Sequence, residues 1–110
     1  MLTCKFKNQL TNEVFVLERE TRSLKFVMIQ SGGYFNGKNH NCYHFEDEVG
    51  NRYNYYSPVD YNGCALTQFG KTLECRENAC TCVISGYFTK NSPLEDSFYI
   101  HNPRLLKVLA

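Results

Sequence analysis

Short runs of aromatic and β-branched residues, separated by glycine, proline and asparagine, follow one another along most of this chain. Residues of the first kind favour strands, and those of the second kind favour turns. No long stretch has the apolar spacing of an amphipathic helix. The sequence therefore predicts an all-β, or mainly β, protein, and its 110 residues leave room for one compact domain with a single core.

Five main strands are expected, with one helical turn between the third and the fourth. The expected strands are 24–30, which continues through a bend at 31–33 to 35 as one coiled strand, and then 42–47, 52–57, 80–89 and 97–101. The helical turn is expected at 65–69. Pro58 is expected to end the third strand because proline cannot donate to a strand ladder. Asn102 and Pro103 are expected to break the last strand and to leave 104–110 as a closing apolar segment.

Glycines mark the expected turns and irregularities. Asn36 and Gly37 suit the centre of a type I′ hairpin turn. Gly50 occupies a turn position that requires a positive φ. Gly86, inside a strand, indicates a bulge or a close approach of two backbones.

The first 23 residues leave two alternatives open. Residues 4–7 and 14–17 could each form a strand, whereas 14–22 could instead open a short helix. In either case we expect an N-terminal extension, 1–23, that packs on the core of a barrel built from 24–110.

Alternation along residues 42–57 sorts their side chains onto two faces. The register that hides most aromatic surface directs toward the core Tyr43, Phe45, Tyr53 and Tyr55. The side chains directed outward are then His44, Glu46, Arg52, Asn54 and Tyr56.

The chain has 8 Phe and 8 Tyr residues, more rings than a core of this size can hide, so some rings must be exposed. Net charge is only +1, which excludes the strongly basic class of nucleic-acid packing proteins. Residues 1–40 carry more cations than anions and could follow a phosphate backbone, although a solvated, partly self-paired face is the more typical reason for such a stretch.

Three segments carry a resemblance to a known family. They are YHFEDEVGNRYNYYS at 43–57, VISGYFTKN at 83–91 and SFYIHNPRLLKVL at 97–109. Together with the expected strand order they resemble the small OB-fold proteins of bacteria, phages and mobile elements that handle single-stranded DNA. The resemblance implies a five-stranded OB-like Greek-key barrel with one short helix, working in DNA replication or repair.

In that family the nucleic acid lies across the second and third strands, between two loops. The residues here that match this surface are Tyr34, Phe35, Lys38, His44, Arg52, Asn54, Tyr56 and Lys90. Rings stack on any base and cations neutralise phosphates, so the resemblance implies binding of single-stranded DNA or RNA, DNA in the first place, with little sequence preference. No catalysis is expected.

Two alternatives remain open. The tyrosines could be half-buried barrel residues with their hydroxyls at the rim. The chain could also be a small protein-interaction module, such as a phage or mobile-element inhibitor or an assembly subunit, that uses the same face or the segment 104–110. Glu46, Asp47 and Glu48 place an acidic cluster beside the proposed surface. The sequence does not indicate the oligomeric state.

Six cysteines and the lack of an apolar leader favour reduced thiols in a soluble, cytoplasmic protein that does not enter membranes. No cofactor is expected. A zinc site is the less favoured reading of the cluster Cys75, Cys80 and Cys82, whose spacing departs from the usual paired motifs. A second candidate ligand set is His40, Cys42 and His44. Cys42, His44 and Asp47 could be combined into a nucleophile set, but none lies in a recognisable nucleophile turn.

Overall fold

The computed structural model describes residues 3–7, 12–35, 37–74, 80–90 and 96–109. Its elements, in chain order, are β1 (Thr3–Lys7), β2 (Val14–Glu18), β3 (Glu20–Phe35), β4 (Lys38–Glu46), β5 (Arg52–Pro58), α1 (Gln68–Glu74), β6 (Cys80–Thr89) and β7 (Ser97–Leu109). The described chain is mostly β with one short helix, as predicted.

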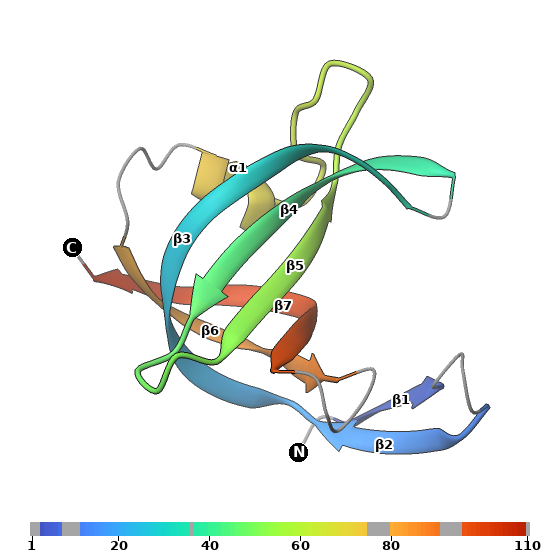
Figure 1. The fold of residues 1–110 in the computed structure, drawn as a ribbon, viewed down its shortest axis with the longest axis vertical. Coiled ribbons are helices and arrows are strands. Elements are labelled where there is room, and N and C mark those ends of the chain that lie inside the picture. Colours follow the sequence, from blue (N-terminus) through green and yellow to red (C-terminus); the bar gives the residue numbers. More distant parts are fainter. Residues whose placement is uncertain (1–2, 8–11, 36, 75–79, 91–95, 110) are drawn as a thin grey trace.

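Five strands close into a barrel in the order β3-β4-β5-β7-β6, with β6 pairing back to β3 (Figure 1). Every neighbouring pair is antiparallel except β5 and β7, which are parallel over Arg52–Asn54 and Ser97–Tyr99. The helix falls between the third and fourth barrel strands, which confirms the predicted order of elements.

The core fills the barrel with the rings that strand alternation directs inward. Tyr43, Phe45, Tyr53 and Tyr55 are all buried, which confirms the predicted faces of β4 and β5. Tyr43 and Tyr55 meet edge to face with ring centroids 6.0 Å apart, an arrangement that aromatic quadrupoles favour. The rest of the core comprises Leu24, Phe26, Phe69, Leu73, Cys82, Ile84, Phe88 and Ile100.

The predicted glycine positions are confirmed where the structure describes them. Gly37 and Gly50 have φ values of 76° and 91°, and Phe35 pairs with Lys38 across a two-residue turn whose other member, Asn36, lies outside the described residues. The predicted bend at 31–33 is a register shift between β3 and β4, with Gly32 at φ 85°.

Gly86 provides both features that its sequence position predicts. The register of β6 against β7 shifts between Ser85 and Tyr87. A Cβ atom on Gly86 would lie 3.2 Å from the carbonyl oxygen of His101, so only glycine allows the two backbones this approach without movement.

The prediction that Asn102 and Pro103 break the last strand is wrong. Pairing stops after His101 and resumes at Arg104, so β7 continues to Leu109 with Asn102 and Pro103 in a bulge. Asn102 adopts φ 49°, and a bulged position tolerates a proline because no ladder hydrogen bond is needed there.

The helix begins later than the predicted turn at 65–69. Thr67 caps it, because the Thr67 hydroxyl accepts a hydrogen bond from the Gly70 amide at 3.1 Å. Ala65 instead forms an isolated bridge with Val59 and donates its amide to Glu74 at 2.7 Å. Helix α1 therefore occupies Gln68–Glu74.

The N-terminal residues form strands, so the helical alternative for 14–22 is wrong. β1 and β2 make a two-stranded antiparallel sheet at the lower end of the barrel (Figure 1). The Phe6 ring lies 5.6 Å from the Tyr87 ring and 4.8 Å from the His101 ring, which joins this sheet to β6 and β7. The first barrel strand begins at Glu20 rather than at residue 24.

Candidate nucleic-acid interface

The solvent side of β3, β4 and β5 carries three rows of side chains that run across the strands. Following the register, the rows are Lys25–Glu46–Arg52, then Met28–His44–Asn54 with Tyr99 of β7, and then Gln30–Cys42–Tyr56. We refer to these residues as the outer face. The structure thus brings together four predicted residues, namely His44, Arg52, Asn54 and Tyr56.

A pair of tyrosines forms the aromatic part of the outer face. The Tyr56 side chain is 42% exposed, and its ring stacks on that of Tyr99 with a centroid distance of 6.1 Å and an angle of 17°. Both rings stand on neighbouring strands, β5 and β7, so their orientation is fixed by the sheet. A flat, partly exposed ring of this kind can stack against a planar ligand.

Tyr99 belongs to the outer face by its pairing with Asn54 and its contact with Tyr56, and it is not among the residues predicted from the sequence. Alternation along 97–101 offers a signal, because Ile100 is buried and its neighbour Tyr99 must face the other way. The parallel pairing of β5 with β7 places Tyr99 beside Tyr56, and no local sequence pattern predicts this pairing.

His44 links three strands of the outer face. Its Nδ1 lies 2.9 Å from Asn54 Oδ1, and its Nε2 lies 3.1 Å from Gln30 Oε1. Both contacts are to amide oxygens, so a neutral imidazole, which has one N–H, requires that one of the two amides turn over and donate instead. In either arrangement the three side chains hold one another in place, and Gln30 joins the predicted residues.

The charged row alternates in sign. Glu46 of β4 stands in register with Lys25 of β3 on one side and Arg52 of β5 on the other. All three side chains are exposed. One anion between two cations leaves this row with a net positive charge beside the tyrosines.

One member of the acidic cluster predicted beside this surface, Asp47, forms hydrogen bonds within the turn between β4 and β5. Asp47 accepts hydrogen bonds from the amides of Val49 and Asn51, from the Asn51 side chain, and from the Tyr53 hydroxyl at 3.0 Å. Burial opposes the charged form, but these hydrogen bonds prevail and lower the pKa of Asp47. The Asp47 charge is therefore satisfied within the β4–β5 turn.

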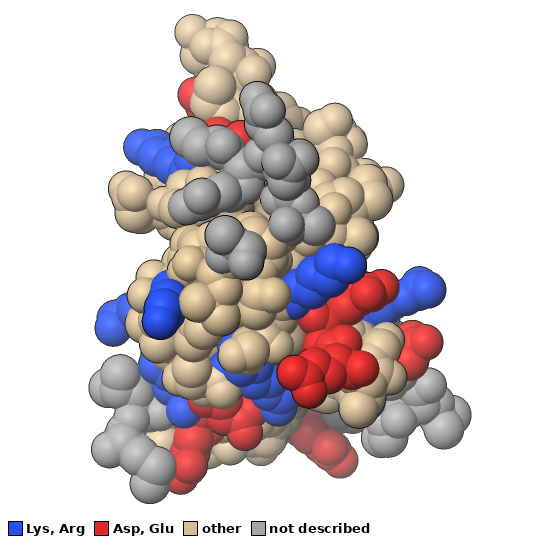
Figure 2. Space-filling model, turned by 90° about the vertical axis from the view of Figure 1, so that its left-hand side faces the viewer, with Lys and Arg blue, Asp and Glu red and all other residues tan. Residues whose placement is uncertain are grey.

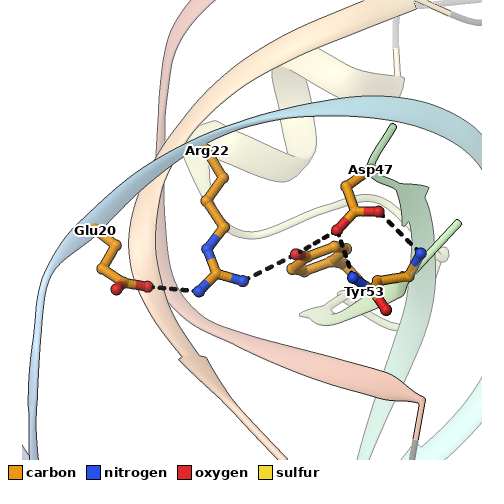
Figure 3. Close-up of polar contacts among 5 residues, drawn as sticks. Glu20, Arg22, Asp47 and Tyr53 are labelled. Carbon is orange, nitrogen blue, oxygen red and sulfur yellow. Dashed lines mark hydrogen bonds and ion pairs between the residues drawn. The ribbon is translucent and has the colours of Figure 1, made fainter. Parts of the chain in front are cut away.

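Below the outer face, a chain of polar contacts crosses the lower end of the barrel (Figure 3). Arg22 donates to Glu20 at 2.7 Å and to the Tyr53 hydroxyl at 2.8 Å, and that hydroxyl donates to Asp47. The Arg22 guanidinium also lies 4.5 Å from the Phe88 ring centroid. Arg22 thus serves the barrel itself rather than a bound phosphate.

Arg19 is used internally as well. It donates to the carbonyl oxygens of Ser85 at 3.0 Å and Asn102 at 2.8 Å, and it lies over the Tyr87 ring. The excess of cations in residues 1–40 is therefore not all available at the surface, because Arg19 and Arg22 hold strands of the protein together. Figure 2 shows one face of the molecule, on which Lys and Arg side chains lie beside Asp and Glu side chains rather than in a field of one sign.

The remaining predicted residues lie at the two ends of the outer face. Lys90 follows β6, and its Nζ is 4.6 Å from the centroid of the Phe98 ring. Tyr34 and Lys38 belong to the far end of the β3–β4 hairpin, residues 31–35 and 37–41, which we call the β3–β4 arm. This arm projects beyond the upper end of the barrel (Figure 1). Tyr34 is 73% exposed and Lys38 is exposed, whereas the side chain of Phe35 lies outside the described part.

The cysteines and histidines do not form a described metal centre. Cys80 and Cys82 place their Sγ atoms 3.8 Å apart, and Cys75 lies outside the described residues. Over the part of the chain that the structure describes, no three histidine, cysteine or acidic side chains gather as a metal ion would require. Along β4, His40, Cys42 and His44 share one side, as alternation predicts.

The hypothetical nucleophile set is not assembled. Burial raises the pKa of the Cys42 thiol, which disfavours the reactive thiolate. His44 contacts Asn54 and Gln30, and Asp47 is held in its turn.

Comparisons of the chain with protein-family models, with curated proteins and with solved structures find no match. No helix within the described ranges is long and apolar enough to span a bilayer.

Proposed function

We propose that this chain is an OB-like Greek-key barrel that binds single-stranded nucleic acid, DNA in the first place, across its outer face. The strand order β3-β4-β5-β7-β6, the parallel pair β5 and β7, and the helix between the third and fourth barrel strands all support an OB-like arrangement.

The stacked pair Tyr56 and Tyr99 is the observation that carries this proposal. A base that stacks on an exposed ring contributes roughly 1–3 kcal/mol to binding, whatever its identity. Arg52 lies on β5 like Tyr56, and its side chain is on the same side of the sheet. There it can neutralise a phosphate of the nucleic acid whose base stacks on Tyr56. Stacking with adjacent charge is the chemistry of sequence-tolerant strand binding.

The test is a fluorescence titration of a labelled oligothymidine of about 15 nucleotides with the full chain, at roughly 50 and 200 mM salt. We expect affinity to fall as salt rises. Tyr56→Ala should weaken binding by roughly 5- to 150-fold, the equivalent of losing one stacked base, whereas Tyr56→Phe, which keeps the ring, should bind like the parent chain.

Arginine variants test the charge part. Arg52→Ala should reduce the salt slope by about one phosphate contact. Arg104→Ala removes another exposed arginine, from β7 where it pairs with β6, and it should leave the slope unchanged. A Tyr56→Ala chain that binds as tightly as the parent contradicts the proposal.

A second candidate function, protein interaction, is favoured by a different surface. Val14 and Val16 of β2 are 63% and 57% exposed, which is unusual for valines on a strand. If this surface carries the function, the labelled oligonucleotide does not bind even at low salt.

A further inference from the structure

A cavity of about 530 Å³ opens between the β3–β4 arm and the loop that follows β5. Both segments project from the same end of the barrel (Figure 1). The cavity is lined by 31–33 and 39–41 of the arm and by 59–63 of the loop. Its volume is in the range of small-molecule sites and admits a single nucleotide.

The cavity begins where the outer face ends. Cys42 pairs with Tyr56, and the next pair on the same side of the sheet is His40 with Pro58. Two residues along a strand span about 7 Å, so along β4 the lining residue His40 lies about that far from Cys42, the partner of Tyr56, and Tyr56 itself does not line the cavity. A single-stranded nucleic acid with one base stacked on Tyr56 would bring its neighbouring base to the opening of the cavity.

The two walls are held in a fixed relation. The Val59 amide donates to the Asn39 carbonyl oxygen at 3.1 Å, which ties the loop to the arm. Within the loop, the Asp60 amide donates to the Cys64 carbonyl oxygen at 2.9 Å. The cavity therefore exists before a ligand binds, which reduces the entropy lost on binding.

The lining favours a neutral, hydrogen-bonding group over a phosphate. None of the described residues that line the cavity is a lysine or an arginine. The acidic member, Asp60, uses its Oδ1 to accept from the amides of Asn62 at 2.8 Å and Cys64 at 3.0 Å. A phosphate would meet this carboxylate without a compensating cation.

Three asparagine amides, each with a donor and an acceptor, contribute to the lining: Asn39, Asn41 and Asn62. The Asn41 residue as a whole is 8% exposed, and it belongs to the cavity wall. Tyr61 lies at the rim with its side chain 91% exposed, so its ring is available for stacking.

We infer that this cavity takes one unstacked base of the bound strand and reads its edge through Asn41 and Asn62. The inference rests on the proposed function and adds to it a base preference at one position. An amide presents a donor and an acceptor side by side, which matches the edge of a base better than that of a sugar or a phosphate.

The test uses oligothymidines in which one position at a time carries dA, dC or dG, titrated against the full chain. We expect one position at which the four bases differ by roughly 5- to 150-fold in affinity, the range of one base read by an amide. The other positions should be tolerant.

Asn41→Ala and Asn62→Ala should both abolish that difference. Asn62 lies in an exposed loop, so its variant tests the inference even if the buried Asn41→Ala chain fails to fold. Gln68→Ala, which removes an exposed amide from α1, should leave the preference intact.

Equal affinity for all four bases at every position, with Tyr56-dependent binding retained, overturns this inference and leaves the proposed function standing. A preference that survives both asparagine variants also overturns it. Absence of binding to every oligonucleotide overturns the proposed function as well.

Discussion

The Tyr53 hydroxyl connects the barrel core to the turn after β4. The ring is buried, and its oxygen accepts from Arg22 and donates to Asp47 (Figure 3). A single oxygen thereby satisfies one cation and one anion at the lower end of the barrel. Hydrogen bonds to charged groups contribute more than neutral ones, so this atom matters beyond the packing of its ring.

Tyr53→Phe should lower the free energy of unfolding by about 1–3 kcal/mol, because it keeps the ring but removes one hydrogen bond from each of two charged partners, Arg22 and Asp47. Urea unfolding measures this loss. Tyr55→Phe is the matched control, since among the described residues the Tyr55 hydroxyl has one long contact, 3.4 Å to Thr67 Oγ1, and its removal should cost less. Equal losses in the two variants would count against the role of the Arg22–Tyr53–Asp47 chain.

His101 makes the stability depend on pH. Burial lowers its pKa below the ordinary 6.5, and its Nε2 lies 2.8 Å from Thr89 Oγ1. The folded chain therefore binds this proton less readily than the unfolded chain, so stability decreases as pH falls below about 6.5.

Urea midpoints measured from about pH 7.5 down to about pH 5 should fall for the parent chain and fall less for His101→Gln. The Asp47 carboxylate affects the stability at lower pH than His101 does. Its pKa is depressed in the folded state, so its stabilising contribution is complete above the ordinary 3.8 and is lost as pH falls below it. Identical pH profiles for the parent and His101→Gln would exclude His101 as the cause.

At the scale of elements, α1 is fixed by a close approach that only glycine permits. A Cβ atom on Gly70 would lie 2.6 Å from Ser57 Oγ and 2.8 Å from the Ala65 Cβ. The Gly70 carbonyl also accepts from the buried Tyr43 hydroxyl at 3.0 Å. The helix therefore sits against β5 and β4 at a distance that a side chain would enlarge.

Gly70→Ala should destabilise the chain by about 1–3 kcal/mol, because overpacking outweighs the helix propensity that alanine gains over glycine. Thermal or urea unfolding provides the measurement, with Gln68→Ala on the exposed side of α1 as the control. A more stable Gly70→Ala chain would contradict the packing described for α1.

The β1–β2 sheet depends on Phe6 for its attachment. A two-stranded sheet alone is marginal in water, and Phe6 packs against Tyr87 and His101 of the barrel. Phe6→Ala should therefore increase amide hydrogen exchange throughout 3–7 and 14–18, while the amides of β4 and β5 stay protected. Loss of protection in all strands together would show that the sheet and the barrel unfold as one unit.

For the molecule as a whole, local sequence patterns predict which segments form strands and which side chains face the core. Contacts between distant residues decide where α1 begins and how far β7 extends. Alternation placed Tyr43 and Tyr55 inside because each strand face is set by neighbouring residues. The start of α1 depended on the Thr67 hydroxyl, and the continuation of β7 past Pro103 depended on a bulge opposite Gly86. Neither dependence can be seen within a short window of sequence.

The candidate interface divides in the same way. His44, Asn54 and Tyr56 follow from alternation along β4 and β5. Tyr99 joins them only through the parallel pairing of β5 and β7, which brings together residues far apart in the chain. Arg22 looks like a free cation in the sequence, but aromatic rings from β6 and β7 surround it in the fold.

The most direct measurement is a map of amide chemical-shift changes when a single-stranded oligonucleotide is added to the ¹⁵N-labelled chain. We expect the largest changes at His44, Asn54 and Tyr56, and in β7 at Tyr99, with little change along 104–109. Changes concentrated on β6 and the second half of β7, or on the β1–β2 sheet, would place the nucleic acid elsewhere and contradict binding across the outer face.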